Sequence, residues 1–252
     1  MFEFLSNKVH KPARIGVAVV TLVLAGCAAP EGMDDIIDPF ETTNRRTHEL
    51  NKSLDRGFLK PASEVYASVV PNPVSIGISN FSNFLDGPGD IVNNLLQLDL
   101  SGAATNTARF AINGTIGLLG VYDAASEAGL YADPTDFGET LHVWGVGEGS
   151  FVELPLIGPS TQRDTAGIVF DAFFNPFMAV LQDEWKLSTT GIKSLDLVGD
   201  RARFSTTVES VLYDSADSYA QSRLFYLQSR RNELGFEPAE EEFFDPYDEL
   251  YE

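Results

Sequence analysis

Cysteine is almost absent from this chain of 252 residues, which contains only Cys27. A single cysteine excludes an intramolecular disulfide, a Cys-x-x-Cys redox pair and a four-cysteine zinc site. Histidine is nearly as rare, because only His48 and His142 lie beyond the N-terminal segment. A histidine-based metal site or catalytic triad is therefore not expected.

Basic residues are also scarce. The chain has 17 Lys and Arg against 37 Asp and Glu, which gives a formal net charge of −20 at pH 7. A surface this negative repels a phosphate backbone instead of releasing its counterions, so nucleic acid is excluded as a principal ligand. The length is sufficient for one large or two small domains with a buried core.

Sequence signatures of catalysis and nucleotide binding are missing. The chain has no Gly-x-Ser-x-Gly elbow, no Walker loop and no His-Glu-x-x-His motif. Gly145, Gly147 and Gly149 have the spacing of a phosphate cradle, but extended chain with Leu154-Pro155 follows where a dinucleotide site needs a helix. We therefore expect neither an enzyme nor a cofactor or metal site.

Long hydrophobic runs are missing as well, apart from one near the N-terminus. Lys8, Lys11 and Arg14 precede a stretch from 15 to 25 that is apolar except for Thr21. This stretch fits the hydrophobic region of a secretory signal peptide, and it is too short for a membrane-spanning helix of roughly 20 residues.

The cysteine stands directly after this stretch. Leu24-Ala25-Gly26-Cys27 resembles the bacterial lipobox, in which signal peptidase cuts before the cysteine and the thiol is diacylated. Two acyl chains and an N-acyl group hold a protein firmly at a membrane. We predict a signal peptide at 1–26, lipid attachment at Cys27 and a lipidated linker at 27–37. The alternative is a lone buried cysteine inside a transmembrane anchor.

From Asp38 to about Gly129 the pattern is that of successive helices. Asn72-Pro73 predicts a helix start with Asn72 as N-cap, and Gly87-Pro88-Gly89 predicts the end of that helix. Ser101 is predicted to cap a further helix. These helices are apolar around most of their circumference, which indicates either burial in a core or contact with lipid.

The stretch from 133 to 159 breaks the helical pattern. Apolar residues at 141, 143, 151, 152 and 154 flank a glycine-rich segment, which predicts a short hairpin or an extended loop. Thr161 is predicted to cap a helix from Asp164 to Phe174. The segment 233–252 contains nine acidic and no basic residues, and we predict an acidic, disordered tail there.

Taken together, motifs spread over residues 38 to 233 resemble the MlaA/VacJ family of outer-membrane lipoproteins. The matching stretches are Asp38-Pro39-Phe40-Glu41 with Asn44-Arg45, Val70-Pro71 with Ile78-Ser79-Asn80-Phe81, Val92-Asn93 with Leu96-Gln97, Arg109-Phe110 with Asn113, Phe137-Gly138-x-Thr140-Leu141-x-x-Trp144-Gly145-Val146-Gly147-x-Gly149, Leu154-Pro155, Gly158-Pro159-Ser160 with Arg163-Asp164, and Tyr219-x-x-x-Arg223-x-x-Tyr226-Leu227-Gln228.

The resemblance implies a mostly α-helical, ring-shaped bundle at 38–232 that is embedded in one membrane leaflet and carries a short Gly-rich hairpin. It also implies a polar channel, through which phospholipids that stray into the outer leaflet reach a periplasmic carrier protein of the MlaC type. A trimeric porin of the outer membrane is the implied partner. Ala28 stands where many inner-membrane lipoproteins have Asp, so export to the outer membrane is expected by resemblance.

Two groups of candidate site residues follow from these motifs. The first is a gating hairpin formed by Trp144, Gly145, Val146, Gly147 and Gly149, since glycine tolerates positive φ and lets a loop move or pack tightly. A rigid structural turn is the alternative for this segment. The second group consists of polar residues of the family motifs that could line the channel: Asn44, Asn51, Asn93 and Asn113.

Other interpretations of the sequence stay open. The polar side chains on these helices could cap and bridge an ordinary soluble bundle. The chain could also be a structural envelope lipoprotein without a lipid pathway, or a periplasmic lipid hydrolase, although the scarcity of histidine argues against a hydrolase.

Overall fold

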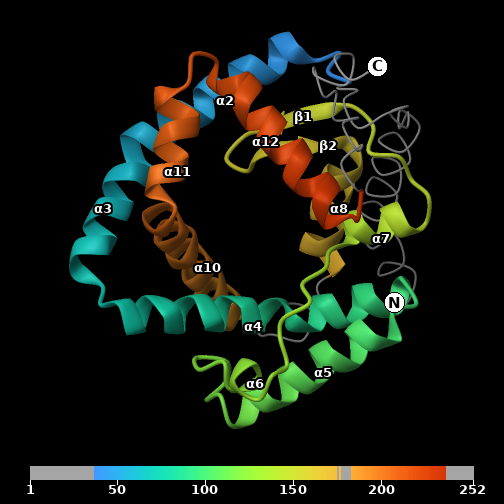
Figure 1. Cartoon of the computed structure of the whole chain (residues 1–252). Helices are drawn as coiled ribbons and strands as arrows, with labels where there is room; N and C mark the ends of the chain where they lie inside the picture. Colours follow the sequence, from blue (N-terminus) through green and yellow to red (C-terminus); the bar gives the residue numbers. More distant parts are fainter. Residues whose placement is uncertain (1–36, 175, 177–182, 237–252) are drawn as a thin grey trace, which may run out of the picture.

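A computed structural model describes residues 37–174, 176 and 183–236 of the chain. The predicted signal peptide, Cys27, almost all of the linker and most of the acidic tail lie outside these residues. Within them the chain forms a ring of helices with one small sheet (Figure 1). The prediction of a mostly helical ring is confirmed.

The first arc of the ring is one continuous, bent helical segment. It consists of α2 (Glu41–Leu54), the π-helical turn η1 (Asp55–Leu59) and α3 (Lys60–Val69). The wider π turn brings Asp55 inward, where it pairs with an arginine of α10. Helix α3 ends at Val70, whose extended backbone leads into Pro71.

Helix α4 (Asn72–Leu96) is longer than the sequence predicted, because it continues through Pro88. The prediction that Gly87-Pro88-Gly89 ends the helix is wrong. A Cβ atom at Gly87 would lie 3.2 Å from the ring of Phe110, so glycine here permits close packing of α4 against α5. The N-cap is Pro71, whereas the sequence predicted Asn72.

Helix α5 (Leu100–Thr115) packs antiparallel beside α4 along the lower side of the ring (Figure 1). Its N-cap is Asp99, whose carboxylate accepts a hydrogen bond from the backbone N–H of Ser101 at 3.1 Å, so the predicted cap at Ser101 is wrong. The rings of Phe84 and Phe110 stack at 4.6 Å between the two helices. A short helix, α6 (Ala124–Glu127), follows.

The region after residue 133 differs most from the prediction. Residues 137–143 form a helix, α7 (Phe137–Val143), which Asp136 caps by accepting from the N–H of Glu139. The hairpin comes later and consists of β1 (Phe151–Leu154) and β2 (Gly158–Thr161), with Phe151 opposite Thr161. The glycine-rich segment is therefore a helix-to-strand connection and not the turn of the hairpin.

The second half of the ring returns through α8 (Gln162–Phe174), α10 (Asp183–Arg203), α11 (Ser205–Glu209), the π turn η2 (Ser210–Asp214) and α12 (Ser218–Glu233). Thr161 caps α8 as predicted, because its hydroxyl accepts from the N–H of Asp164 at 3.1 Å. Helix α10 packs against both α3 and α4, and α12 packs against β2. These contacts close the ring.

Burial in the ring is the reverse of that in an ordinary soluble domain. Among the described residues, 22 of the buried side chains are polar or charged and 11 are hydrophobic. The hydrophobic ones form small clusters, one around Phe137, Leu141 and Ala166 and another around Phe151, Tyr219 and Leu227. Thin walls provide little interior, so hydrogen bonds carry much of the packing, and many large apolar side chains face outward.

Candidate functional site

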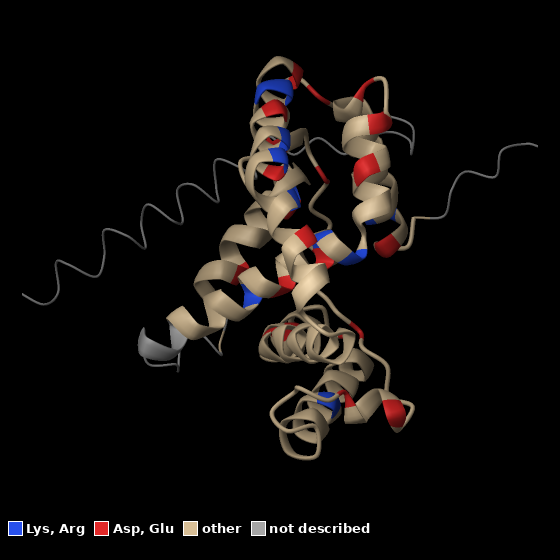
Figure 2. Ribbon diagram, turned by 90° about the vertical axis from the view of Figure 1, so that its left-hand side faces the viewer, with Lys and Arg blue, Asp and Glu red and all other residues tan. Residues whose placement is uncertain are grey.

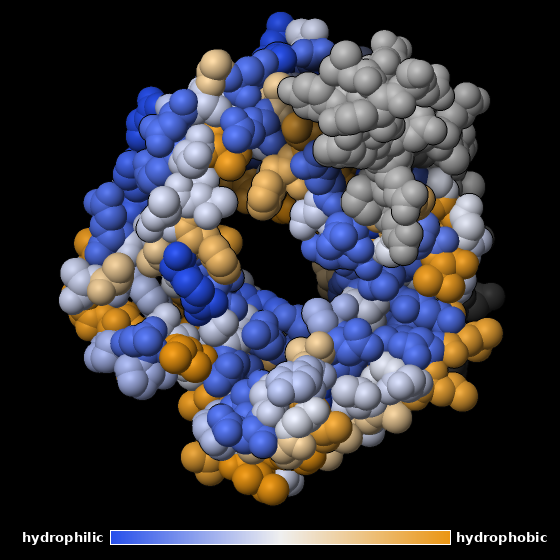
Figure 3. Space-filling model, in the orientation of Figure 1, coloured by the Kyte–Doolittle hydropathy of each residue, from blue (hydrophilic) through white to orange (hydrophobic). Residues whose placement is uncertain are grey.

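An open hole runs through the middle of the molecule (Figure 3). Helices α2, α3, α4, α7, α8, α10 and α12 surround it in the same view (Figure 1). Hydrophilic side chains line much of its rim, whereas hydrophobic side chains gather on the outer edges over α4 and α5 (Figure 3). The ring therefore offers a polar-rimmed passage, with an apolar outer surface over α4 and α5 (Figure 3).

A polar cavity of about 390 Å³ lies between α4 and α5. We refer to it as the lower cavity. Asparagines and carboxylates dominate its lining, together with one guanidinium, that of Arg109. Arg109 is itself paired with Asp123 at 3.0 Å. Burial, reinforced by nearby carboxylates, raises the pKa of Asp90 in this lining to about 7.

A second cavity, of about 330 Å³, lies between α2, the hairpin turn, α10 and α12, and we refer to it as the upper cavity. Its walls are apolar and its floor is polar. The walls comprise Leu59, Leu156, Ile157, Leu197, Phe204, Val208 and Leu212. The polar lining comprises His48, Asn51, Lys52, Asp55, Glu153, Asp200, Arg201 and Ser222.

The floor of the upper cavity contains a chain of buried polar contacts. Nδ1 of His48 lies 3.4 Å from Oε1 of Glu153, and Nε2 of His48 lies 3.0 Å from the hydroxyl of Ser218. Nζ of Lys52 donates to the same hydroxyl at 3.1 Å. His48, Glu153 and Ser218 are all buried. No sequence pattern reveals this acid–histidine–serine arrangement, because its members lie far apart in the chain.

Asp55 and Arg201 form a further buried pair beside this floor. Nε and Nη2 of Arg201 donate to the two carboxylate oxygens of Asp55 at 2.8 and 3.1 Å. The hydroxyl of Tyr213 donates to Asp55 at 2.8 Å as well. The pair joins η1 to α10 and so fixes the width of the ring on this side.

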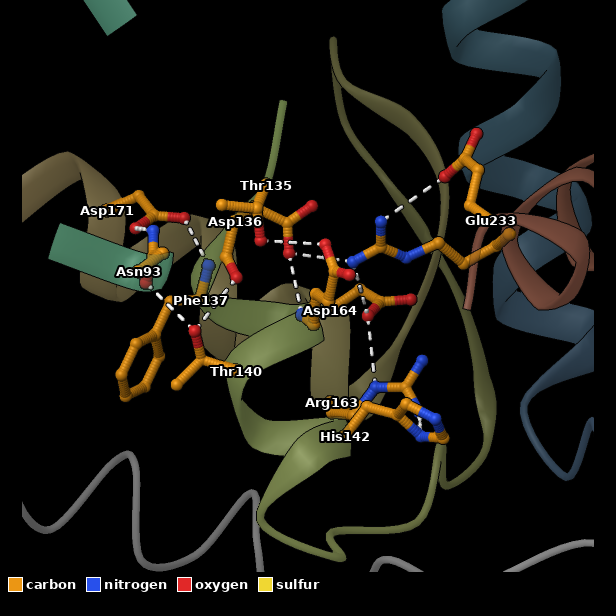
Figure 4. A network of polar contacts seen from close by, with 12 residues as sticks. Asn93, Thr135, Asp136, Phe137, Thr140, His142, Arg163, Asp164, Asp171 and Glu233 are labelled. Carbon is orange, nitrogen blue, oxygen red and sulfur yellow. Dashed lines mark hydrogen bonds and ion pairs between the residues drawn. The ribbon is translucent and has the colours of Figure 1, made fainter. Parts of the chain in front are cut away.

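On the opposite side of the ring, a polar network joins α7, α8 and α12 (Figure 4). Arg230 of α12 contacts Asp136 at 2.7 Å and Asp164 at 3.3 Å, while Nε of Arg163 donates to Asp164 at 3.1 Å. Burial alone would raise the pKa of Asp164, but the two guanidinium groups outweigh it and lower that pKa. His142 borders the network, and burial lowers its pKa.

The four predicted asparagines lie in four different places, and each one binds protein groups. Asn44 donates to Asp38 and to the carbonyl of Phe151, and it accepts from the N–H of Glu153. Asn51 holds the hairpin by donating to the carbonyl of Leu154 and accepting from the N–H of Leu156. Both link α2 to the hairpin.

The other two brace the lower half of the ring. Asn93 donates to Asp171 at 3.3 Å and accepts from the hydroxyl of Thr140 at 3.1 Å, which joins α4 to α7 and α8. Asn113 donates to Asp123 at 2.8 Å and accepts from the N–H of Ala125 at 2.9 Å. Asn51 lines the upper cavity and Asn113 the lower one. A role of the four in lining the channel stays a prediction.

The predicted gating segment begins as a tight helix ending. Gly145 has a φ of +84°, its N–H donates to the carbonyl of His142, and the N–H of Val146 donates to that of Leu141. This is a Schellman ending, in which glycine is favoured because of its left-handed backbone. Nε1 of Trp144 donates to the carbonyl of Leu96 at 3.0 Å, which ties the segment to α4.

The fold and the two cavities define a class of protein: a helical ring around an open passage with a largely polar rim and an apolar outer edge along α4 and α5 (Figure 3). The chain belongs to the MlaA lipoprotein family, whose family model matches residues 36–233. The family predicted from the motifs is thereby confirmed.

Curated relatives agree with this membership. The chain is 34% identical to the Escherichia coli K12 protein named "intermembrane phospholipid transport system lipoprotein MlaA" over 218 residues, which cover 84% of each chain. It is 31% identical over 206 residues to an uncharacterized protein of Rickettsia bellii, covering 81% of this chain and 80% of the relative.

A solved structure agrees as well. It belongs to work described as the structural basis for maintenance of bacterial outer membrane lipid asymmetry. The match has a TM-score of 0.68 and 30% sequence identity, and it covers 78% of this chain and 98% of the solved chain.

Proposed function

We propose that this chain is an outer-membrane lipoprotein that removes mislocalised phospholipids from the outer leaflet through the hole in the ring. It passes them to a periplasmic carrier for retrograde transport and so maintains the lipid asymmetry of the membrane. The observation that carries the proposal is the open, polar-rimmed hole in a ring whose lower edge is apolar (Figure 3). A leaflet built of lipopolysaccharide accommodates a stray phospholipid poorly, so a passive channel suffices.

The reversed burial pattern supports embedding of the ring in one leaflet, the inner one. Exposed apolar side chains are concentrated on the lower half of the ring, for example Leu95, Leu100 and Ile116. From residue 72 to 122 the chain has only four charged residues, and the elements at the bottom of Figure 2 are mostly tan, with few red or blue positions. Within the described ranges, no helix combines the length and apolar character needed to cross a membrane.

Strained leucines support the same conclusion. All four non-glycine residues with positive φ in the described part of the chain are leucines: Leu98, Leu118, Leu119 and Leu156. Their exposed fractions range from 65% to 84%. The left-handed conformation costs a leucine about 1–2 kcal/mol, and water would favour Gly or Asn instead. Contact with membrane lipid explains why leucine stands at positions 98, 118 and 119, whereas Leu156 lines the upper cavity.

Anchoring and partners complete the proposal. Lipid attachment at Cys27 holds the chain at the membrane, a trimeric porin accommodates the ring, and an MlaC-like carrier receives the lipid on the periplasmic side. Support for these points comes from the lipobox-like sequence and the family resemblance. Copurification with crosslinking of the full lipoprotein tests the two protein partners.

The segment from Trp144 to Gly149 is proposed to border the passage and to gate it. The hydrogen bond from Trp144 to the carbonyl of Leu96 supports this proposal, because a movement of α4 would act on the segment through it. A disulfide engineered across this segment tests the gate, because locking should abolish lipid removal. Full transport in the locked protein would instead establish the rigid turn that the Schellman ending favours.

The decisive experiment for the function as a whole is deletion of the gene followed by measurement of phospholipid in the outer leaflet. We expect more outer-leaflet phospholipid and greater sensitivity to detergent and bile, both restored by the full chain. Unchanged asymmetry after deletion would favour the alternative of a structural envelope lipoprotein without a lipid pathway.

A second candidate, lipid hydrolysis, is favoured by one observation: the contacts among Glu153, His48 and Ser218. In a hydrolase, the histidine would take the proton of the serine hydroxyl while the carboxylate orients the ring. Incubation of the purified protein with phospholipid separates the two functions. Intact lipid supports transport, whereas fatty acid released by the wild type but not by Ser218→Ala would establish the hydrolase.

A further inference from the structure

Two buried polar atoms in the upper cavity have no hydrogen-bond partner among the described residues. They are Oε2 of Glu153 and the hydroxyl of Ser222. Glu153 is 4% exposed and Ser222 is 7% exposed, and both line this cavity. Leaving a buried carboxylate oxygen and a hydroxyl unsatisfied costs free energy, so such atoms indicate a place for a ligand that donates hydrogen bonds.

The other oxygen of the carboxylate is already held in place. Oε1 of Glu153 accepts from Asn51 at 3.2 Å and faces His48 at 3.4 Å. The backbone of Glu153 is fixed as well, because its N–H donates to Asn44. The free oxygen is therefore presented by a rigid side chain.

The charges that line the upper cavity favour a positively charged hydrogen-bond donor. Lys52 and Arg201 are the two cations of the lining, against the three carboxylates of Asp55, Asp200 and Glu153. Arg201 is engaged by Asp55 and by Glu209. Lys52 contacts the hydroxyl of Ser218 and no carboxylate that the structure describes. The lining thus combines an excess of negative charge with one ammonium, that of Lys52, which contacts a hydroxyl and the ring of Tyr213 and can also meet a phosphate.

We propose that the upper cavity is a headgroup subsite that prefers phospholipids with a primary amine, namely phosphatidylethanolamine. The ligand's ammonium donates to Oε2 of Glu153 and to the hydroxyl of Ser222, its phosphate meets Lys52, and an acyl chain lies along the apolar walls. Phosphatidylcholine has no N–H to donate. Phosphatidylglycerol has hydroxyl donors but no positive charge to offset the carboxylate of Glu153. This inference rests on the proposed transport of phospholipids and specifies their headgroup.

The test uses the full lipoprotein, purified in detergent and loaded with a fluorescent phospholipid. Dihexanoyl phosphatidylethanolamine, phosphatidylglycerol and phosphatidylcholine then compete for displacement. We expect the ethanolamine lipid to compete roughly tenfold better, which corresponds to one charge-assisted hydrogen bond. This comparison needs no variant, so it does not depend on the folding of a mutant.

Substitutions test whether Glu153 and Ser222 cause the preference for the ethanolamine headgroup. Glu153→Gln keeps the shape of the side chain and should abolish the preference, and Ser222→Ala should reduce it severalfold. Glu64→Gln, at an exposed position on α3, removes the same charge and should leave the preference intact, as should Ser229→Ala on the exposed side of α12.

The outcomes separate the two proposals. Equal competition by the three lipids, or a preference that survives Glu153→Gln, overturns the subsite and leaves phospholipid transport standing. No binding of the fluorescent phospholipid at all overturns both.

Discussion

Leu98 and Gly145 occupy the same position in two helix endings. Each is the first residue beyond the C-cap of a helix, α4 and α7 respectively, and each has a left-handed backbone, with φ of 61° and 84°. In both endings the two N–H groups that follow the cap donate back to helix carbonyls. Glycine is the usual residue at this position. The ending of α4 is an exception, because it has a leucine there that is 84% exposed.

The substitution Leu98→Gly should raise the free energy of unfolding in detergent by about 0.5–1 kcal/mol, because it removes the backbone strain of leucine. Conversely, Gly145→Ala should lower the free energy of unfolding by about 1 kcal/mol. A Cβ atom at Gly145 would meet nothing within 4 Å, so the loss comes from φ alone. Denaturant titrations of both variants check these values, and destabilisation by Leu98→Gly would contradict the strain argument.

Lipid contact by the loop after α5 predicts a loss of membrane binding on substitution. Replacing Leu118 and Leu119 together by Asn, which tolerates a positive φ, should preserve folding and weaken labelling by a lipid-soluble photoreactive probe severalfold. Leu50→Asn on α2 is the matched control, since this exposed leucine lies at the opposite side of the ring (Figure 1). Equal labelling of all three proteins would refute contact of this loop with lipid.

Closure of the ring beside the upper cavity depends on the buried pair of Asp55 and Arg201. We expect Asp55→Asn to lower the free energy of unfolding by about 1.5–3 kcal/mol, because it removes the charge-assisted hydrogen bonds of Asp55 and leaves the buried guanidinium only the carboxylate of Glu209. Asp86→Asn serves as the control, since the pair of Asp86 and Lys193 is exposed and should contribute less than about 1 kcal/mol. Denaturation followed by circular dichroism measures both; similar losses would argue against the special role of the buried pair.

The lower cavity predicts a dependence of stability on pH. Burial raises the pKa of Asp90 to about 7 in the folded protein, from an ordinary value near 4 in the unfolded chain. Between these values the folded state binds more protons than the unfolded state, so the contribution of Asp90 to stability falls as pH rises from about 4 to about 7. Burial also raises the pKa of Asp171, which acts in the same direction.

The substitution Asp90→Asn should therefore flatten this part of the stability profile. It should raise the free energy of unfolding at pH 8 by about 1–2 kcal/mol, since an amide is not charged there and can still accept from Thr135. Unfolding measured at intervals from pH 4 to pH 8 checks the slope. A variant as pH-dependent as the wild type would show that Asp90 does not carry the effect.

Much of the fold was predictable because its signals are local. The cap at Thr161 depends on residues within one helical turn, and the prediction of a mostly helical ring followed from motifs spread along the chain. The predictions that were wrong concern glycine and proline. Gly87-Pro88-Gly89 is typical of a helix end, but α4 continues through it. Glycine stands inside this helix because Phe110 packs closely against position 87. The hairpin was placed too early because helix α7 is only a few residues long.

The sequence by itself determined the family, the mostly helical character, the excess of negative charge and the signature of a lipoprotein at Cys27, because these depend on composition and on short contiguous motifs. The tertiary structure decided which polar side chains meet. Glu153 of β1 meets His48 of α2, and Asp55 of η1 meets Arg201 of α10, which lies 146 residues further along the chain. Contacts between such distant residues arise only when the chain closes on itself, so no local pattern in the sequence records them.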